Sequence, residues 1–123
     1  MVNLPVTKDI NGESGAVALS VDDILYMRHS SRLRRVVVYT ADDIYYTTGP
    51  LNYWCTTLNN SGYAFSNGDR TAAINLRKVI RVNDFFKTAY FDLNSKEGCM
   101  LSKKGYEDLR EQLESLSIPF VMI

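Results

Sequence analysis

The sequence predicts a mainly β domain of small, packed antiparallel sheets, with one short central helix and one C-terminal helix. Three observations favour this fold class. About nine short β-prone runs, separated by turn residues, follow one another at a spacing of roughly ten residues. Only two stretches place apolar residues at helical spacing. The sequence lacks the β–α–β alternation that would indicate a parallel sheet.

The length of the chain, 123 residues, is sufficient for a single domain that buries a core of its own. Its content of 46% hydrophobic and 23% charged residues is that of an ordinary globular protein. No apolar run approaches the roughly 20 residues of a membrane-spanning helix, and the first residues lack the pattern of a secretory signal. We therefore expect a cytoplasmic protein that has no contact with a membrane.

The chain is expected to consist of three parts: a lead-in, a domain and a tail. Residues 1–15 are predicted to form an irregular lead-in, because proline and glycine residues interrupt any regular element there. Residues 16–117 are predicted to form the domain itself. Residues 118–123 are predicted to form an apolar tail that packs back on the domain.

The first half of the domain is predicted to be a meander of strands. Ala16–Ser20 is the first β-prone run, and Ile24–Met27 and Val36–Thr40 are expected to pair antiparallel. The basic segment Arg28–Arg35 is expected to join these two strands as an exposed loop. Ile44–Thr48 adds a further strand after a tight turn.

A short helix is predicted after the meander. Pro50 suits the first turn of such a helix, and Gly62 suits a left-handed cap beyond its end. Positions i, i+3, i+4 and i+7 of one apolar face are occupied by Leu51, Trp54, Cys55 and Leu58. We expect this face, with Trp54 as its anchor, to pack under the sheet.

The second half is predicted to contain further strands and the last helix. The β-prone runs are Arg70–Leu76, Val79–Val82, Phe85–Leu93 and Cys99–Leu101, and a turn at Asn94–Gly98 joins the last two. Ser102 is expected to cap the final helix. The apolar stripe of that helix consists of Tyr106, Leu109, Leu113 and Leu116.

Basic residues are concentrated in three places, although the chain, with 14 basic and 14 acidic residues, has no net charge. Four arginines lie within Arg28–Arg35, a second group lies within Arg70–Lys87, and Lys103 and Lys104 begin the last helix. If these groups converge on one face, they provide the electrostatic surface that a polyanion requires. Guanidinium groups also make paired hydrogen bonds to phosphate or to guanine. A solvated face without a ligand is the alternative interpretation of the same charges.

Catalysis is poorly supported by the sequence. His29 is the only histidine and has no carboxylate close to it in the chain. Asp22-Asp23 and Asp42-Asp43 are typical of turns, since neighbouring strand positions face opposite sides. Cys55 and Cys99 are isolated and are expected to be ordinary buried thiols. The sequence contains no glycine-rich phosphate loop and no run of metal ligands, so we expect no enzyme, no cofactor and no metal site.

Several motifs follow one another in a particular order. They are VDDILYM at residues 21–27, VVVYT at 36–40, F-x-N-x-D-R-T-x-x-I-N-L at 65–76 and M-L-S-K-K at 100–104. This order resembles the LytTR family of bacterial DNA-binding domains. The resemblance implies a β-rich module that enters successive major grooves of duplex DNA with its loops. Most members carry an upstream receiver domain or a membrane segment, for which this chain has no room, so it resembles a stand-alone, divergent member.

The resemblance also implies three DNA-contacting segments. They map onto His29–Arg35, onto Asn67–Thr71, which corresponds to R-x-H-R-S in the family, and onto Ser102–Lys104 at the start of the last helix. Within these segments the residues expected to contact DNA are Arg32, Arg34, Arg35, Asn67, Arg70, Thr71, Lys103 and Lys104.

Two functions are consistent with these observations. The first is a sequence-specific regulator of transcription that binds duplex DNA, with two protomers binding a direct repeat as a homodimer on DNA. The second is a protein-interaction module on the same fold with weakened DNA binding. Two departures from the family motif favour the second function: Asn67 replaces the first arginine, and Asp69 replaces the histidine and puts an acidic group where phosphate would pass.

Overall fold

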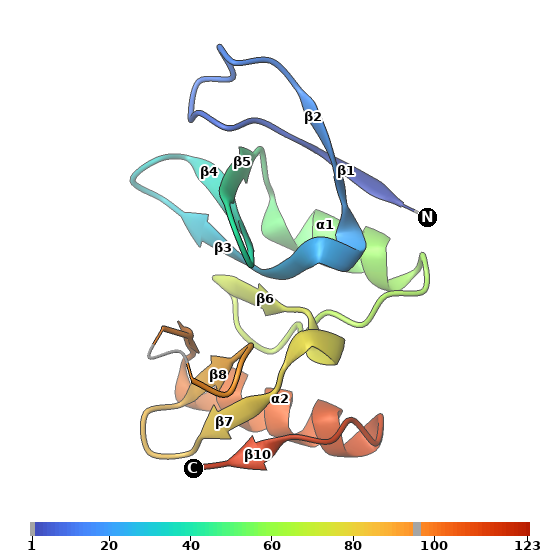
Figure 1. The fold of residues 1–123 in the computed structure, drawn as a ribbon, viewed down its shortest axis with the longest axis vertical. Coiled ribbons are helices and arrows are strands. Elements are labelled where there is room, and N and C mark those ends of the chain that lie inside the picture. The colour runs from blue at the N-terminus through green and yellow to red at the C-terminus, as the bar shows by residue number, and fades with distance from the viewer. Residues whose placement is uncertain (1, 95–96) are drawn as a thin grey trace.

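A computed structural model describes residues 2–94 and 97–123, whose strands form three sheets (Figure 1). In chain order the elements are β1 (Asn3–Val6), β2 (Val17–Ser20), the 3₁₀ turn η1 (Val21–Asp23), β3 (Ile24–Ser30), β4 (Arg35–Thr40), β5 (Ile44–Thr47), α1 (Leu51–Asn59), β6 (Ala72–Ile74), the 3₁₀ turn η2 (Leu76–Lys78), β7 (Arg81–Asn83), β8 (Thr88–Tyr90), β9 (Cys99–Met100), α2 (Lys103–Ser115) and β10 (Val121–Met122). The sheets have the strand orders β1-β2, β5-β4-β3-β6 and β10-β7-β8-β9. The predicted fold class, mainly β with packed sheets and two helices, is confirmed.

The main sheet is the predicted meander β3-β4-β5 with β6 added on the other side of β3. All of its strand pairs are antiparallel. The predicted exposed loop Arg28–Arg35 is too long, because β3 continues to Ser30 and β4 begins at Arg35. Arg28 pairs with Val37 across this ladder, so its charge does not end the strand. Only residues 31–34 form the turn of the hairpin.

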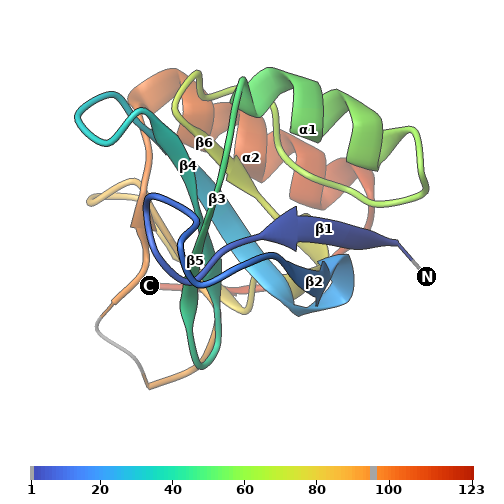
Figure 2. The same ribbon diagram turned by 90° about the horizontal axis from the view of Figure 1, so that it is seen from above.

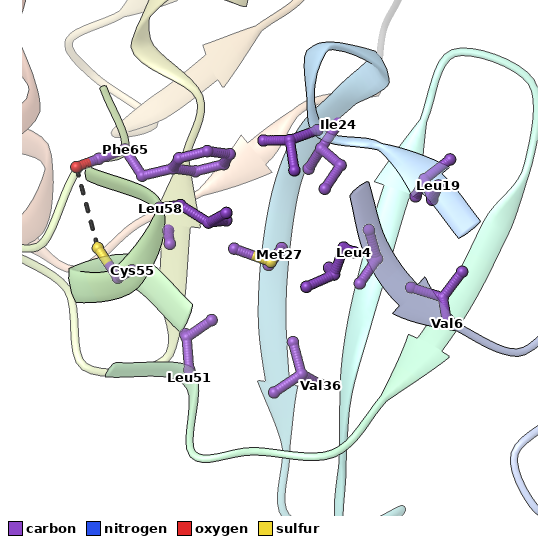
Figure 3. Packing of buried hydrophobic residues seen from close by; sticks show 13 residues of the cluster. Leu4, Val6, Leu19, Ile24, Met27, Val36, Leu51, Cys55, Leu58 and Phe65 are labelled. Carbon is purple, nitrogen blue, oxygen red and sulfur yellow. Dashed lines mark hydrogen bonds between the residues drawn. The ribbon is translucent and has the colours of Figure 1, made fainter. Parts of the chain in front are cut away.

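The first core lies between α1, the main sheet and the β1–β2 pair (Figure 3). Leu51, Cys55 and Leu58 point from α1 into this core, as the helical spacing predicts. Trp54 lies at the edge of the core and is only half-buried, and its indole Nε1 donates to the backbone oxygen of Thr48 at 2.6 Å.

The N-terminal part of the chain corrects the predicted irregular lead-in at residues 1–15. Asn3–Val6 form β1, which pairs antiparallel with β2. Leu4 and Val6 are buried in the first core, and the residues that alternate with them are exposed. This two-residue period stabilises a strand even though Pro5 lies within it, since proline is tolerated at a sheet edge.

The predicted strand Phe85–Leu93 is wrong except at its centre, where Thr88–Tyr90 form β8. Phe85 and Phe86 instead lie in the β7–β8 turn, with 84% and 55% of their surface exposed. Asn83 Oδ1 accepts a hydrogen bond from Phe86 N at 2.9 Å, so a local side-chain partner replaces a neighbouring strand.

The other strands of the second half are shorter than predicted. The expected run at 70–76 is present only as β6, and its end belongs to the 3₁₀ turn η2. The expected run at 79–82 is present only as β7. The predicted strand Cys99–Leu101 is present as β9. The predicted turn Asn94–Gly98 lies partly outside the described residues.

The second core lies between α2 and the sheet β10-β7-β8-β9, and it also contains Ile74 from β6. Tyr106, Leu109 and Leu113 of α2 are buried in it, as predicted. Leu116 is the exception, with 44% of its surface exposed, because it follows the last helical residue and leaves the apolar stripe. The tail continues from there to β10, which pairs in parallel with β7.

No described helix is long and apolar enough to cross a membrane. Residues 2–94 and 97–123 also contain no cluster of three or more side chains that could hold a metal ion.

Candidate nucleic-acid interface

The three predicted contact segments meet beside one end of the main sheet. Because β6 pairs with β3, the residues before β6 run alongside the end of β3, and His29 N donates to the backbone oxygen of Thr71 at 2.8 Å. Ser102 N, just before α2, donates to Asp69 Oδ2 at 2.9 Å. Figure 2 accordingly shows the β3–β4 hairpin and the start of α2 on the same side of the molecule. We call the exposed surface of residues 31–34, 67–71 and 102–104 the basic face.

The hairpin turn presents two free arginines on this face. Ser30 Oγ accepts a hydrogen bond from Leu33 N at 3.2 Å, and Arg34 has a left-handed backbone with φ of 56°. The side chains of Arg32 and Arg34 are exposed and have no hydrogen bond or ion pair within the described part of the chain. Both guanidinium groups are therefore available to an anionic ligand.

Arg35, the third arginine predicted to contact DNA, has a different environment. It is half-buried, its Nε donates to the backbone oxygen of Ile10 at 2.9 Å, and its Nη1 donates to the backbone oxygen of Arg34 at 2.8 Å. The guanidinium group thus ties the β1–β2 loop to the hairpin. This geometry indicates that Arg35 supports the basic face from behind.

The Arg35→Ala variant is expected to lose about 1–2 kcal/mol of unfolding free energy, because two backbone carbonyls lose a charged donor. The matched variant Arg32→Ala removes the same charge from an exposed side chain and is expected to change stability by less than about 0.5 kcal/mol. Urea unfolding of both variants measures the difference. Equal stabilities would show that Arg35 has no supporting role.

Asp69 lies within the second segment, is half-buried, and has hydrogen-bond partners within the protein for both carboxylate oxygens. Its Oδ1 accepts hydrogen bonds from Thr71 N at 2.8 Å and from Thr71 Oγ1 at 2.9 Å, while Oδ2 accepts from Ser102 N. Desolvation raises the pKa of Asp69, but the hydrogen bonds from Ser102 and Thr71 outweigh it and leave the pKa below its ordinary value. Both oxygens of this carboxylate are therefore engaged in hydrogen bonds within the protein.

Acid is expected to weaken the Asp69 contact. A carboxyl group with a lowered pKa contributes its full stability above the ordinary value of 3.8 and loses it as the pH falls through the folded-state pKa. The unfolding free energies of the wild type and Asp69→Asn should therefore converge as the pH falls below about 4. A gap that stays constant between about pH 7 and about pH 2 would contradict this assignment.

The remaining side chains of the second segment differ in their freedom. Asn67 and Arg70 are exposed and have no hydrogen bond within residues 2–94 and 97–123, whereas the Thr71 hydroxyl is bound to Asp69. Asn67 and Arg70 border a hollow of about 300 Å³ whose other side is formed by the start of α1. They are therefore accessible to a ligand.

The start of α2 supplies the third segment. Ser102 Oγ accepts a hydrogen bond from Gly105 N at 3.0 Å, which confirms the predicted cap. Lys104 Nζ pairs with Asp108 Oδ2 at 2.7 Å on the exposed surface, so its charge is partly neutralised. Lys103 is exposed and has no partner among the described residues.

Arg28 and His29 are neighbours near the face, but their side chains have different environments. Arg28 Nη2 donates to Cys99 Sγ at 2.9 Å and to the backbone oxygen of Met100 at 2.6 Å, so it links the main sheet to β9. His29 is exposed at the end of β3, beside Thr71. Because successive residues of a strand face opposite sides of the sheet, the sequence could have predicted that Arg28 and His29 point in opposite directions.

The two cysteines are buried free thiols, as predicted. Cys55 belongs to the first core and Cys99 to the second. Burial raises the pKa of both thiols, that of Cys99 to about 11, although the Arg28 guanidinium partly opposes the shift at Cys99. Both thiols are therefore protonated and weakly reactive at neutral pH.

Comparison with known proteins agrees with this geometry. The family model of the LytTr DNA-binding domain matches residues 14–114. A solved structure, the LytTr DNA-binding domain of a protein from Bacillus cereus described as a methyl-accepting/DNA response regulator, is similar with a TM-score of 0.69. The match covers 92% of this chain and 97% of that chain at 12% sequence identity, which is evidence of a shared fold. No curated protein sequence matches this chain.

Proposed function

Since this chain belongs to the LytTR family of DNA-binding domains, which serve transcription regulation and are not enzymes, we propose that it recognises specific duplex sequences with its basic face, in the major groove. One observation carries this proposal. Four cations from three separate segments lie on one face without an ion-pair partner among the described residues, and they are Arg32, Arg34, Arg70 and Lys103. The negatively charged phosphates of a DNA backbone are suitable partners for them.

The exposed side chains suggest a division of roles. Arg34 and Arg70 have the guanidinium geometry that suits the O6 and N7 atoms of guanine, and Asn67 suits the adenine edge. Arg32, Lys103 and Lys104 suit phosphates, since a phosphate contact needs charge more than orientation. Thr71 and Arg35 then hold the neighbouring backbone in place.

The shape of the face is compatible with the major groove. A two-stranded β ribbon fits this groove. β3 and β4 are the central strands of the main sheet, but the tip of their hairpin, residues 30–35, extends beyond the residues that pair with β5 and β6 and carries the arginines. The start of α2 lies beside it and carries the partial positive charge of a helix N-terminus. We propose that one such face covers one half-site and that two protomers bind a direct repeat cooperatively.

A protein-interaction module with weakened DNA binding is the second candidate. One observation favours it: three large apolar side chains away from both cores, Phe85, Phe86 and Met100, are more than half exposed. The acidic group at Asp69, by contrast, no longer favours it, because that carboxylate is hydrogen-bonded within the fold. A partner that is still captured after alanine replaces Arg32, Arg34, Arg70 and Lys103 would support this second function.

Selection of bound duplexes from a random DNA pool tests the proposed function. We expect enrichment of a repeated motif, and we expect methylation of guanine N7 within that motif to interfere with binding, since N7 lies in the major groove. Absence of enrichment would contradict sequence-specific binding. Enrichment without N7 interference would contradict entry from the major groove.

A further inference from the structure

We infer that Asp69 is a positioning residue whose carboxylate locks the 67–71 segment onto the start of α2, so that its negative charge strengthens DNA binding instead of opposing it. This inference rests on the proposed function. Electrostatics alone would predict that an acidic residue beside DNA weakens binding, and the inferred effect of Asp69 is the opposite.

The carboxylate of Asp69 joins two segments that are 33 positions apart in the chain. Oδ2 accepts from Ser102 N, and Oδ1 accepts from both the backbone and the hydroxyl of Thr71. All three partners are donors, so both carboxylate oxygens must act as acceptors. An asparagine has only one acceptor oxygen, and its NH₂ group would face a donor at one of these two sites.

Two glycines allow this close approach. A Cβ on Gly105 would lie 2.7 Å from Asp69 Cβ, and a Cβ on Gly68 would lie 2.4 Å from Asp108 Cβ. Neither glycine has a positive φ, so neither is required by its backbone conformation. The absence of a side chain instead lets the backbone at Gly105 pack against the Asp69 side chain, and the backbone at Gly68 pack against the Asp108 side chain.

The lock determines where two of the free cations lie. Arg70 follows Asp69 directly in the chain, and Lys103 follows Ser102 directly. The contact between Asp69 and Ser102 therefore fixes the backbone positions from which these two cations extend. Because paired contacts to bases and phosphates depend on such spacing, a loosened junction should weaken binding even when the net charge rises.

The matched pair Asp69→Asn and Asp108→Asn provides the test. Each substitution adds one unit of positive charge beside the basic face, and Asp108→Asn also frees Lys104 from its ion pair. In titrations with the selected duplex at fixed salt, we expect Asp69→Asn to bind about five- to tenfold more weakly than the wild type. We expect Asp108→Asn to bind about two- to fivefold more tightly.

A background variant separates positioning from general destabilisation. In a chain that already carries Asn67→Ala, Arg70→Ala, Lys103→Ala and Lys104→Ala, Asp69→Asn should cause no further loss of affinity, because the DNA-contacting side chains that it positions are gone. A further loss in that background would indicate a general structural role and overturn the inference. All titrations are made at a temperature at which circular dichroism shows each variant fully folded.

The remaining outcomes are also decisive. If the wild type binds and Asp69→Asn binds equally well or more tightly, the positioning role is wrong while the proposed function stands. If the wild type binds no duplex, the proposed function fails, and the positioning role fails with it.

Discussion

The Arg70→Ala variant is expected to bind the selected duplex about 5- to 150-fold more weakly than the wild type, because a bidentate contact to guanine is worth about 1–3 kcal/mol. Arg70 is exposed on the basic face and has no competing partner among the described residues. The loss should be concentrated at one base pair, so discrimination at that position should relax as well. Fluorescence anisotropy titration of the consensus duplex and its single-base variants measures both effects.

Arg77→Ala is the matched control for Arg70. Arg77 is also an exposed arginine, but it lies in η2, beyond the far end of β6 from the basic face. Removal of its charge should change affinity by less than about twofold, because exposed charges further apart than a Debye length of about 8–10 Å are largely screened. Equal losses in the two variants would show that only net charge matters, and an Arg70→Ala variant with wild-type affinity would exclude Arg70 from the interface.

Leu109→Ala is expected to lower the free energy of unfolding by about 2–5 kcal/mol, the range for a large-to-small change in a packed core. Leu109 is fully buried in the second core, where α2 packs against the sheet. Loss of its side chain leaves a cavity that rigid strands close only in part. Urea unfolding followed by circular dichroism gives the value.

Leu116→Ala provides the comparison within the same predicted stripe. Because 44% of the Leu116 surface is exposed, we expect Leu116→Ala to lower the free energy of unfolding by less than about 1 kcal/mol. If Leu109 and Leu116 contributed equally, α2 would have to continue past Ser115 with its apolar face buried, contrary to the structure. A folded Leu109→Ala variant should keep its DNA affinity, because this residue supports the helix and does not contact the ligand.

Much of the fold could be predicted from the sequence because its signals are local. The helical spacing of Leu51, Cys55 and Leu58 and the cap at Ser102 depend only on neighbours in the chain. The alternation of Leu4 and Val6 is equally local, but a run of two apolar positions broken by Pro5 is too short to distinguish a strand from a lead-in. At Phe85 and Phe86, β-propensity misleads because a hydrogen bond from Phe86 N to Asn83 Oδ1 stabilises a turn.

The site is harder to predict, because the sequence shows which side chains are charged but does not show which groups each of them contacts. Arg32, Arg34 and Arg35 are alike in sequence, yet Arg35 donates to backbone oxygens 1 and 25 positions away and the other two donate to none of the described residues. Asp69 likewise has the sequence character of a repulsive group. Its actual partner, Ser102 N, becomes visible only when the chain has brought the two segments together.

The salt dependence of DNA affinity tests the role of the basic face most directly. The wild type is compared with a variant in which alanine replaces Arg32, Arg34, Arg70 and Lys103. For the wild type we expect the logarithm of the association constant to fall linearly with the logarithm of the salt concentration, and we expect the slope of the variant to be shallower by about one unit for each phosphate contact removed. Preference for the selected sequence should disappear in the variant. A variant with the wild-type slope and the wild-type preference would show that DNA binds elsewhere on the molecule.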